Sequence, residues 1–188
     1  MNLLARDIAG LMILESPTWG DDRGFFREWF KGPDFDGAGI AFTVRQANLS
    51  MSVCNVVRGL HYSLATEGQA KVVTCAFGSL DDVIVDVRVG SPTFGALEVV
   101  HLEAGDGRSV YLPAGVAHGF VVRSERAALT YLLSSPFNAA VELEINPMDP
   151  AIGVPWNLAV APILSDKDAS APTLDERRRA DELPRYAR

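Results

Sequence analysis

Short apolar runs separated by glycine and proline are the feature that most limits what this chain can fold into. Sixteen glycines and eleven prolines interrupt the 188 residues at short intervals. Runs of strand length that end at turn residues predict an all-β sandwich or barrel. The runs that carry this prediction are 70–77, 82–87, 97–102, 109–112, 119–122 and 129–133.

Periodicity refines the prediction in one strand and at two helices. In 82–87, Asp82 and Asp86 alternate with valines, which indicates a strand with its acidic residues on one face. Residues 33–42 form one short, glycine-rich helical candidate. The other begins at a capping box, Thr173 with Glu176, and its helix formers continue to residue 183, where Pro184 stops them. We therefore expect one β domain over 1–168, with 169–188 as its helical C-terminal appendage.

Charge and hydropathy exclude several classes of partner. The net charge of −7 and the pI of about 4.9 argue against nucleic-acid binding, which needs basic stripes. The basic run 177–179 is interpreted as a solvated helix face, because acidic residues flank it. The apolar runs are far shorter than the roughly 18 residues of a membrane span. Two cysteines, Cys54 and Cys75, are too few for a disulfide framework and predict a cytoplasmic protein.

Three histidines are present, and two of them lie in unusual surroundings. His101 lies in an apolar strand and is interpreted as structural. His61 follows an Arg-Gly-Leu sequence, and His118 ends the spacing Gly107, Pro113, Gly115, His118. This spacing resembles the second motif of the cupin superfamily, which implies a small jelly-roll barrel. Metal-dependent cupins also carry a His-X-His motif, which this sequence lacks, so we expect acid–base chemistry with no metal and no cofactor.

Several motifs in a fixed order extend the resemblance over most of the chain. From Arg23 to Asp168 the sequence closely resembles the dTDP-4-dehydrorhamnose 3,5-epimerase family. That family acts on a nucleotide-linked 4-keto-6-deoxyhexose, whose carbonyl acidifies the C–H bonds at C3 and C5. Removing a proton from one face and returning it to the other needs a base, an acid and a group that stabilises the enolate. The motifs lie at 58–62, 69–73, 82–88, 90–95, 112–120, 130–132 and 164–168.

The resemblance assigns the catalytic roles. His61 takes the position of the base, and Asp82 that of the carboxylate that would complete a His61–Asp82 dyad. Asp168 matches a second acidic residue near the base. Tyr131 matches the proton donor, since a phenol of ordinary pKa is protonated near neutrality. Lys71 matches the cation near the C4 oxygen of the sugar.

The resemblance also assigns nucleotide-sugar contacts. Arg23 and Glu28 belong to an N-terminal binding segment, 22–28. Phe137 stands where many members have a tyrosine that stacks on thymine, and it retains the aromatic ring but not the hydroxyl. The remaining matched contact positions are Gln46, Asn48, Arg58, His118, Glu142 and Lys167.

The expected activity is therefore epimerisation of a dTDP-4-dehydro-6-deoxyhexose at C3, C5 or both. The alternatives are a 3-only or 5-only epimerase of an antibiotic sugar, a metal-dependent cupin oxygenase, and a sugar-nucleotide-binding module without activity. The resemblance further implies a homodimer in which an N-terminal strand crosses the interface, so that Arg23 and Glu28 would reach the partner's site.

Overall fold

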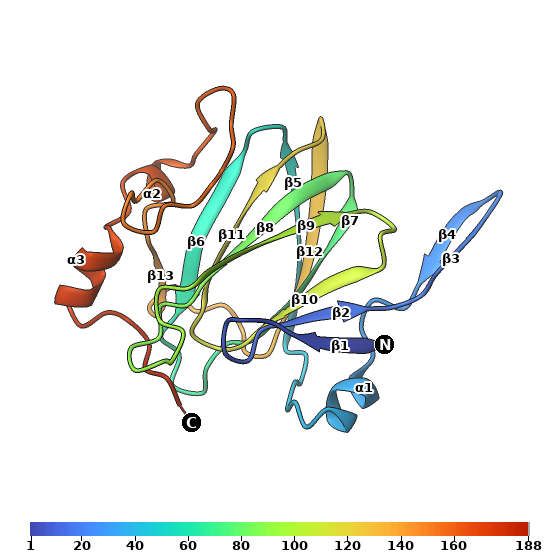
Figure 1. Cartoon of the computed structure of the whole chain (residues 1–188), viewed down its shortest axis with the longest axis horizontal. Coiled ribbons are helices and arrows are strands. Elements are labelled where there is room, and N and C mark those ends of the chain that lie inside the picture. Colours follow the sequence, from blue (N-terminus) through green and yellow to red (C-terminus); the bar gives the residue numbers. More distant parts are fainter. Residues whose placement is uncertain (188) are drawn as a thin grey trace.

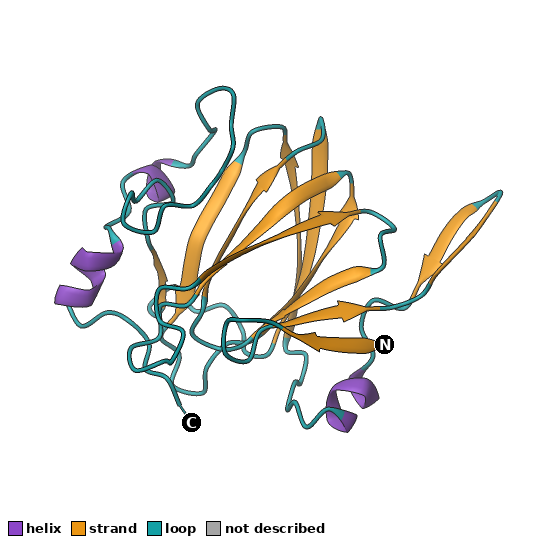
Figure 2. Cartoon of the chain, viewed as in Figure 1, coloured by secondary structure: helices purple, strands orange, loops and turns teal. Residues whose placement is uncertain are grey.

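The computed structural model describes residues 1–187 and consists mainly of antiparallel strands, with three short helices at the periphery (Figure 2). The strands are β1 (Asn2–Ala5), β2 (Met12–Glu15), β3 (Thr18–Asp21), β4 (Gly24–Arg27), β5 (Gln46–Val53), β6 (Val57–Ser63), β7 (Lys71–Phe77), β8 (Ser79–Val85), β9 (Leu97–Glu103), β10 (Arg108–Leu112), β11 (Ala117–Val122), β12 (Arg126–Leu133) and β13 (Glu142–Glu144). The helices are α1 (Gly32–Gly37), α2 (Asp166–Ala169) and α3 (Leu174–Arg179).

Two large sheets face each other around the main core (Figure 1). The first has the strand order β1-β2-β10-β7-β12-β5, and the second has the order β13-β6-β11-β8-β9. Alternate residues of both sheets point inward, so Leu80, Leu102, Val110, Phe120 and Leu129 pack together between them. Each of the six apolar runs identified in the sequence overlaps a strand, although 82–87 extends two residues past the end of β8, which confirms the all-β prediction.

Strand β8 and the residues after it are buried on both faces. Ile84 points into the core between the sheets, whereas Val83 and Val85 pack outside the second sheet against Trp156 and Leu183. The C-terminal residues therefore cover the outer face of that sheet. Because both faces are covered, the acidic residues of the predicted alternating pattern do not lie on a solvated face.

The helix near the C-terminus begins as predicted but ends early. The Thr173 hydroxyl and the Glu176 carboxylate form the expected reciprocal capping box. The helix ends at Arg179 rather than near residue 183, because Asp181 adopts a left-handed φ of 56°. The interpretation of 177–179 as a solvated face is wrong for Arg177, which is buried.

A two-stranded hairpin, β3–β4, extends away from the two sheets (Figure 1). Its aromatic side chains Trp19, Phe25 and Phe26 are each more than half exposed. Such a group of exposed aromatic residues is typical of a contact surface. As for membranes, none of the helices in residues 1–187 has both the length and the apolar character that a span requires.

Candidate active site

A polar cavity of about 240 Å³ opens between the ends of the two sheets. Strands β6 and β13 of the second sheet supply one side, and β7 and β12 of the first sheet supply the other. Helix α2 and its N-cap close a third side. The residues that line the cavity are Arg58, His61, Gln69, Lys71, Tyr131, Leu133, Phe137, Glu142, Leu143, Ser165, Lys167 and Asp168.

His61 is oriented by Asp168. Its Nε2 lies 2.7 Å from Asp168 Oδ1, and the Asp168 side chain is only 5% exposed, whereas that of His61 is 42% exposed. A carboxylate can only accept here, so the neutral imidazole carries its proton on Nε2 and leaves Nδ1 as the free base. The pair thus combines a buried carboxylate with an accessible imidazole.

The predicted His61–Asp82 dyad is wrong. Asp82 Oδ1 instead lies 2.6 Å from Nε2 of His118, and both residues are buried. The reason lies in the strand order and register. Strand β11 lies between β8 and β6, and Asp82 on β8 is opposite Phe120 of β11. His118, two residues from Phe120, is therefore the nearer imidazole. Asp168 reaches His61 from α2, far along the chain.

The surroundings of Asp168 favour its charged form. Burial alone would raise the pKa of this carboxyl, but hydrogen bonding and the charge of His61 outweigh burial and lower the pKa. The Ser165 hydroxyl and the Gly59 N–H add further hydrogen bonds. Ser165 also caps α2, since its Oγ accepts from the Asp168 N–H at 3.1 Å. The helix N-terminus therefore fixes the carboxylate that orients His61.

Two glycines let β6 and β11 approach each other closely beneath the site. A Cβ at Gly59, which has a φ of 120°, would lie 2.6 Å from the Gly119 Cα. A Cβ at Gly119 would lie 2.6 Å from the Arg58 carbonyl oxygen. Neither position has room for a side chain, so the Arg-Gly-Leu-His segment requires its glycine.

Lys71 is a buried cation on the side of the cavity formed by the first sheet. Its side chain lies in the interior, and burial lowers its pKa, although the carboxylates of Glu142 and Asp82 oppose this effect. Glu142 is itself held by Gln69, whose Nε2 donates to Glu142 Oε1 at 2.8 Å. An ammonium group in such a place can stabilise negative charge that develops on a ligand.

Of the expected binding residues, Arg58, Phe137, Glu142 and Lys167 line the cavity, whereas Gln46, Asn48 and His118 do not. The Gln46 side chain connects the loop of Phe137 to β5: its Oε1 accepts from the Phe137 N–H at 2.9 Å, and its Nε2 donates to Asn48 at 2.9 Å. Arg58 donates to Ser52 at 3.0 Å. The Phe137 ring is exposed at the cavity mouth.

Arg23 and Glu28 are not brought to this cavity. Arg23 lies at the tip of the β3–β4 hairpin, where it pairs with Asp21, and Glu28 lies just after the hairpin. Within one chain these two residues therefore do not join the other candidate ligands.

Sequence reasoning missed Gln69 and Ser165 as functional residues. The signals were present, because Gln69 lies two residues before Lys71, and Ser165 has the spacing of an N-cap before Asp168. His101 lies in strand β9, as expected, and its exposed side chain places Nδ1 2.7 Å from Asp81 Oδ1. Within residues 1–187, no three His, Cys, Asp or Glu side chains are gathered closely enough to hold a metal ion.

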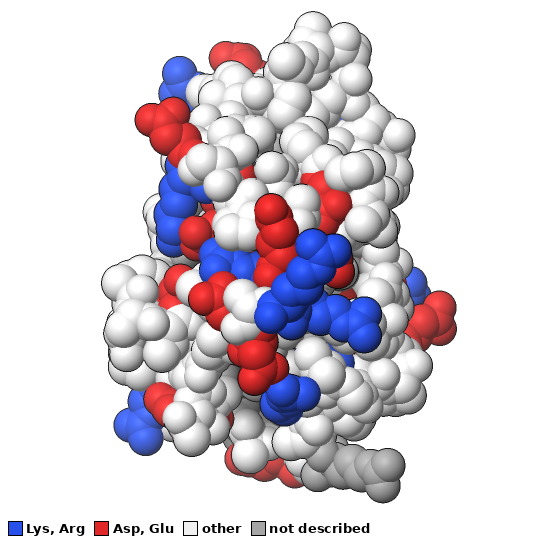
Figure 3. Space-filling model, turned by 90° about the vertical axis from the view of Figure 1, so that its left-hand side faces the viewer, with Lys and Arg blue, Asp and Glu red and all other residues white. Residues whose placement is uncertain are grey.

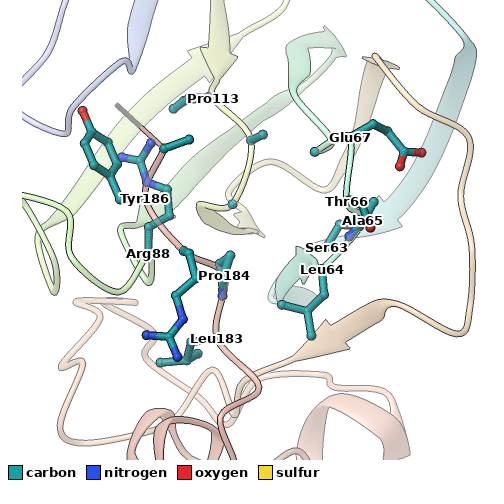
Figure 4. Close-up of a pocket in the computed structure, with 15 residues that line it drawn as sticks. Ser63, Leu64, Ala65, Thr66, Glu67, Arg88, Pro113, Leu183, Pro184 and Tyr186 are labelled. Atoms are coloured by element: carbon teal, nitrogen blue, oxygen red, sulfur yellow. The ribbon is translucent and has the colours of Figure 1, made fainter.

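A larger cavity, of about 550 Å³, lies between the loop after β6 and the C-terminal segment (Figure 4). In it, Arg88 lies over the Tyr186 ring and Glu67 lies across the opening. The Arg88 guanidinium is already bound to the Asp86 carboxylate, with a shortest distance of 2.8 Å. The residues described around this cavity include no histidine, whereas the smaller cavity contains His61.

A jelly-roll barrel that holds an imidazole, a phenol and a buried ammonium around one cavity defines a protein suited to proton transfer. The sequence model of the family described as dTDP-4-dehydrorhamnose 3,5-epimerase matches residues 5–176. The chain belongs to this family of isomerases, which confirms the resemblance and the jelly-roll fold.

Relatives and solved structures agree with this assignment. A dTDP-4-dehydro-6-deoxyglucose 3-epimerase of Streptomyces bikiniensis is 42% identical over 95% of this chain and 92% of its own length. A dTDP-4-dehydrorhamnose 3,5-epimerase of Mycobacterium tuberculosis is 41% identical over 96% of this chain and 91% of its own. The structure of a 4-keto-6-deoxy sugar epimerase from the novobiocin cluster of Streptomyces spheroides has a TM-score of 0.94 at 40% identity, covering 99% of this chain and 94% of that one. The Legionella pneumophila enzyme in complex with dTDP-4-keto-L-rhamnose has a TM-score of 0.92 at 38% identity, covering 100% and 99%.

Proposed function

We propose that this protein epimerises a dTDP-4-dehydro-6-deoxyhexose at C3, C5 or both. The observation that carries the proposal is the His61–Asp168 pair, at 2.7 Å, in the same cavity as Tyr131 and Lys71. These groups form a complete acid–base set for a carbon acid beside a ketone. A binding module would have no need of a buried carboxylate that fixes the tautomer of an accessible histidine.

The base and the acid enter the cavity from different sheets. His61 comes from β6 of the second sheet, and Tyr131 comes from β12 of the first. A sugar ring between them would present one face to each, as inversion of a carbon centre requires. In our mechanism Nδ1 of His61 removes the proton, Lys71 stabilises the enolate oxygen at C4, and Tyr131 returns a proton from the other face.

The nucleotide would be held at the rim of the cavity. Arg58 and Lys167 supply positive charge for the diphosphate, and the exposed Phe137 ring can stack on the thymine. Gln46 and Asn48 would fix the loop that carries this ring. His118 and Glu142 would contact the ligand from deeper in the barrel.

We also propose that the working form is a homodimer. Arg23 and Glu28 lie away from their own cavity, and the β3–β4 hairpin that carries Arg23 exposes three aromatic side chains. Strand β5, at the edge of the first sheet, exposes Leu49, Met51 and Val53. Pairing of two chains through these surfaces would cover apolar side chains and bring one hairpin to the partner's cavity. Light scattering after size-exclusion chromatography tests this, and a fully active monomer would refute it.

We further infer a cytoplasmic location. Both cysteines, Cys54 and Cys75, are free thiols, and Cys75 is buried. Unpaired thiols are usual in a reducing compartment.

Deuterium exchange tests the activity directly. The protein is incubated with dTDP-4-dehydro-6-deoxyglucose in heavy water, and the product is analysed by NMR. Deuterium at C3, at C5 or at both is expected, and its position distinguishes a single from a double epimerase. A His61→Asn variant should lower the uptake by about 100-fold or more. No uptake by the wild-type protein would overturn the proposal, and uptake by His61→Asn at the wild-type rate would remove His61 from the role of base.

A further inference from the structure

One carboxylate, that of Glu144 on β13, is shared by cations from both C-terminal helices. Glu144 Oε2 lies 2.8 Å from Lys167 Nζ on α2. Glu144 Oε1 lies 3.6 Å from the Arg177 guanidinium on α3. Arg177 also donates through Nε to the Glu144 backbone carbonyl at 3.0 Å. Acidic and basic side chains are correspondingly interspersed on the face of the molecule that carries these helices (Figure 3).

The two cations differ sharply in their freedom to move. The Lys167 side chain is 60% exposed and lines the candidate active site. The Arg177 side chain is 9% exposed and is further bound through Nη1 to Glu182 Oε2 at 2.6 Å. The Glu144 side chain between them is 14% exposed. Lys167 can therefore leave the network, whereas Arg177 and Glu144 remain in place.

Departure of Lys167 would leave Glu144 with a single cation. A mostly buried carboxylate without a counter-charge is strongly disfavoured. Arg177 is already fixed beside it, with Nη2 3.6 Å from Glu144 Oε1, so its positive charge continues to stabilise the carboxylate after the lysine has left. Glu182, which is 43% exposed, keeps its solvation and balances part of the arginine charge.

We propose that Arg177 is a positioning residue that makes Lys167 available to the diphosphate of the nucleotide sugar. It does so by stabilising Glu144 once the lysine has moved from the carboxylate to the phosphate oxygens. The proposal rests on the proposed function in one respect, namely that the ligand carries a diphosphate beside Lys167.

The first test is calorimetric titration of the full-length protein with dTDP. Arg177→Gln is expected to raise the Kd for dTDP about tenfold, because Glu144 then retains Lys167. Arg177→Lys keeps the positive charge but not the several donors, so it should weaken dTDP binding less than Arg177→Gln does. Arg179→Gln is the matched control: this neighbouring arginine is exposed, pairs with Asp175 and should leave the Kd unchanged. Circular dichroism verifies that each variant is folded.

A double-variant cycle separates this role from a merely structural one. Glu144→Gln frees Lys167, so dTDP should bind at least as tightly as to the wild type. In the Glu144→Gln background, Arg177→Gln should no longer weaken binding. The proposal would be overturned if Arg177→Gln still weakened dTDP binding in the Glu144→Gln background, or if Glu144→Gln alone bound dTDP more weakly than the wild type. The Glu144→Gln measurement tests the proposal even if Arg177→Gln fails to fold. Failure of the wild-type protein to bind dTDP would instead refute the proposed function.

Discussion

His61 and His118 are directly opposite each other on the neighbouring antiparallel strands β6 and β11, yet each imidazole binds a different carboxylate. His61 pairs with Asp168 at the cavity, and His118 pairs with Asp82 in the interior. One Asp82 oxygen, Oδ2, is buried without a hydrogen-bond partner within residues 1–187. In the mechanism we propose, the first pair orients the accessible base His61, and the second supplies buried negative charge near Lys71.

The first prediction compares the two carboxylates. Asp168→Asn should lower the rate of deuterium uptake at saturating substrate by about 100-fold, because the amide no longer fixes or stabilises the charged imidazole. Asp82→Asn should lower it less, by about tenfold, since it acts on His118 and Lys71 and not on the base. The uptake rates of both variants, measured by NMR, provide the comparison. Equal losses would argue against the division described above.

The second prediction concerns Tyr131. Tyr131→Phe removes the phenol but keeps the ring that packs partly against the core. Removal of the substrate proton by His61 should continue, so deuterium exchange with retained configuration should persist. Inversion should fall by about 100-fold, because the acid on the opposite face is missing. Product configuration and deuterium content are measured in the same NMR experiment. If exchange and inversion fall together, Tyr131 is not a separate acid.

The third prediction is that the buried charge of Lys71 lowers the free energy of unfolding. Its pKa in the folded protein is lowered by burial, so the folded state binds this proton less tightly than the unfolded state does. Lys71→Met should therefore raise the melting temperature at pH 7 while greatly reducing activity. The penalty disappears as pH rises above the folded pKa toward about 10.4, the ordinary lysine pKa. The difference in melting temperature between variant and wild type should accordingly narrow from pH 7 to pH 10, and a constant difference would contradict this account.

The fourth prediction concerns acid stability at Asp86. Burial acts to raise its pKa, but hydrogen bonds from Arg88, Ser91 and Thr93 prevail and lower it to about 2. A depressed carboxyl pKa stabilises the fold above the unfolded pKa, and the effect is lost as pH falls from about 4 toward 2. At pH 7 the ionised group should contribute about 2 kcal/mol. Urea unfolding of wild type and Asp86→Asn from pH 7 to pH 2 should show their free energies of unfolding converging on acidification.

Local patterns were sufficient to predict most of the barrel. Alternation and turn residues located β7 to β12, and the capping box located the start of α3. The length of α3 was not predictable from composition, because the helix formers continue past Arg179 and only the left-handed backbone at Asp181 ends the helix. The burial of Arg177 also depends on contacts with β13, about thirty residues earlier in the chain.

Four of the five catalytic candidates could be predicted as members of the site, but their pairing could not. Motif positions named His61, Lys71, Tyr131 and Asp168, and all four line one cavity. Which carboxylate orients His61 depends on how α2 folds back across the sheet. No local sequence pattern indicates that this fold brings Asp168 to His61. The sequence places Asp82 closer to His61 along the chain, and strand order then separates the two.

The contact between Gly59 and Gly119 limits how this protein could be redesigned. A Cβ at either glycine would lie 2.6 Å from a backbone atom of the other strand, so neither position tolerates a larger residue. A redesign for a different sugar preference must therefore change other residues. The candidates are the loop of Phe137 and the residues beside α2, where side chains have room to change.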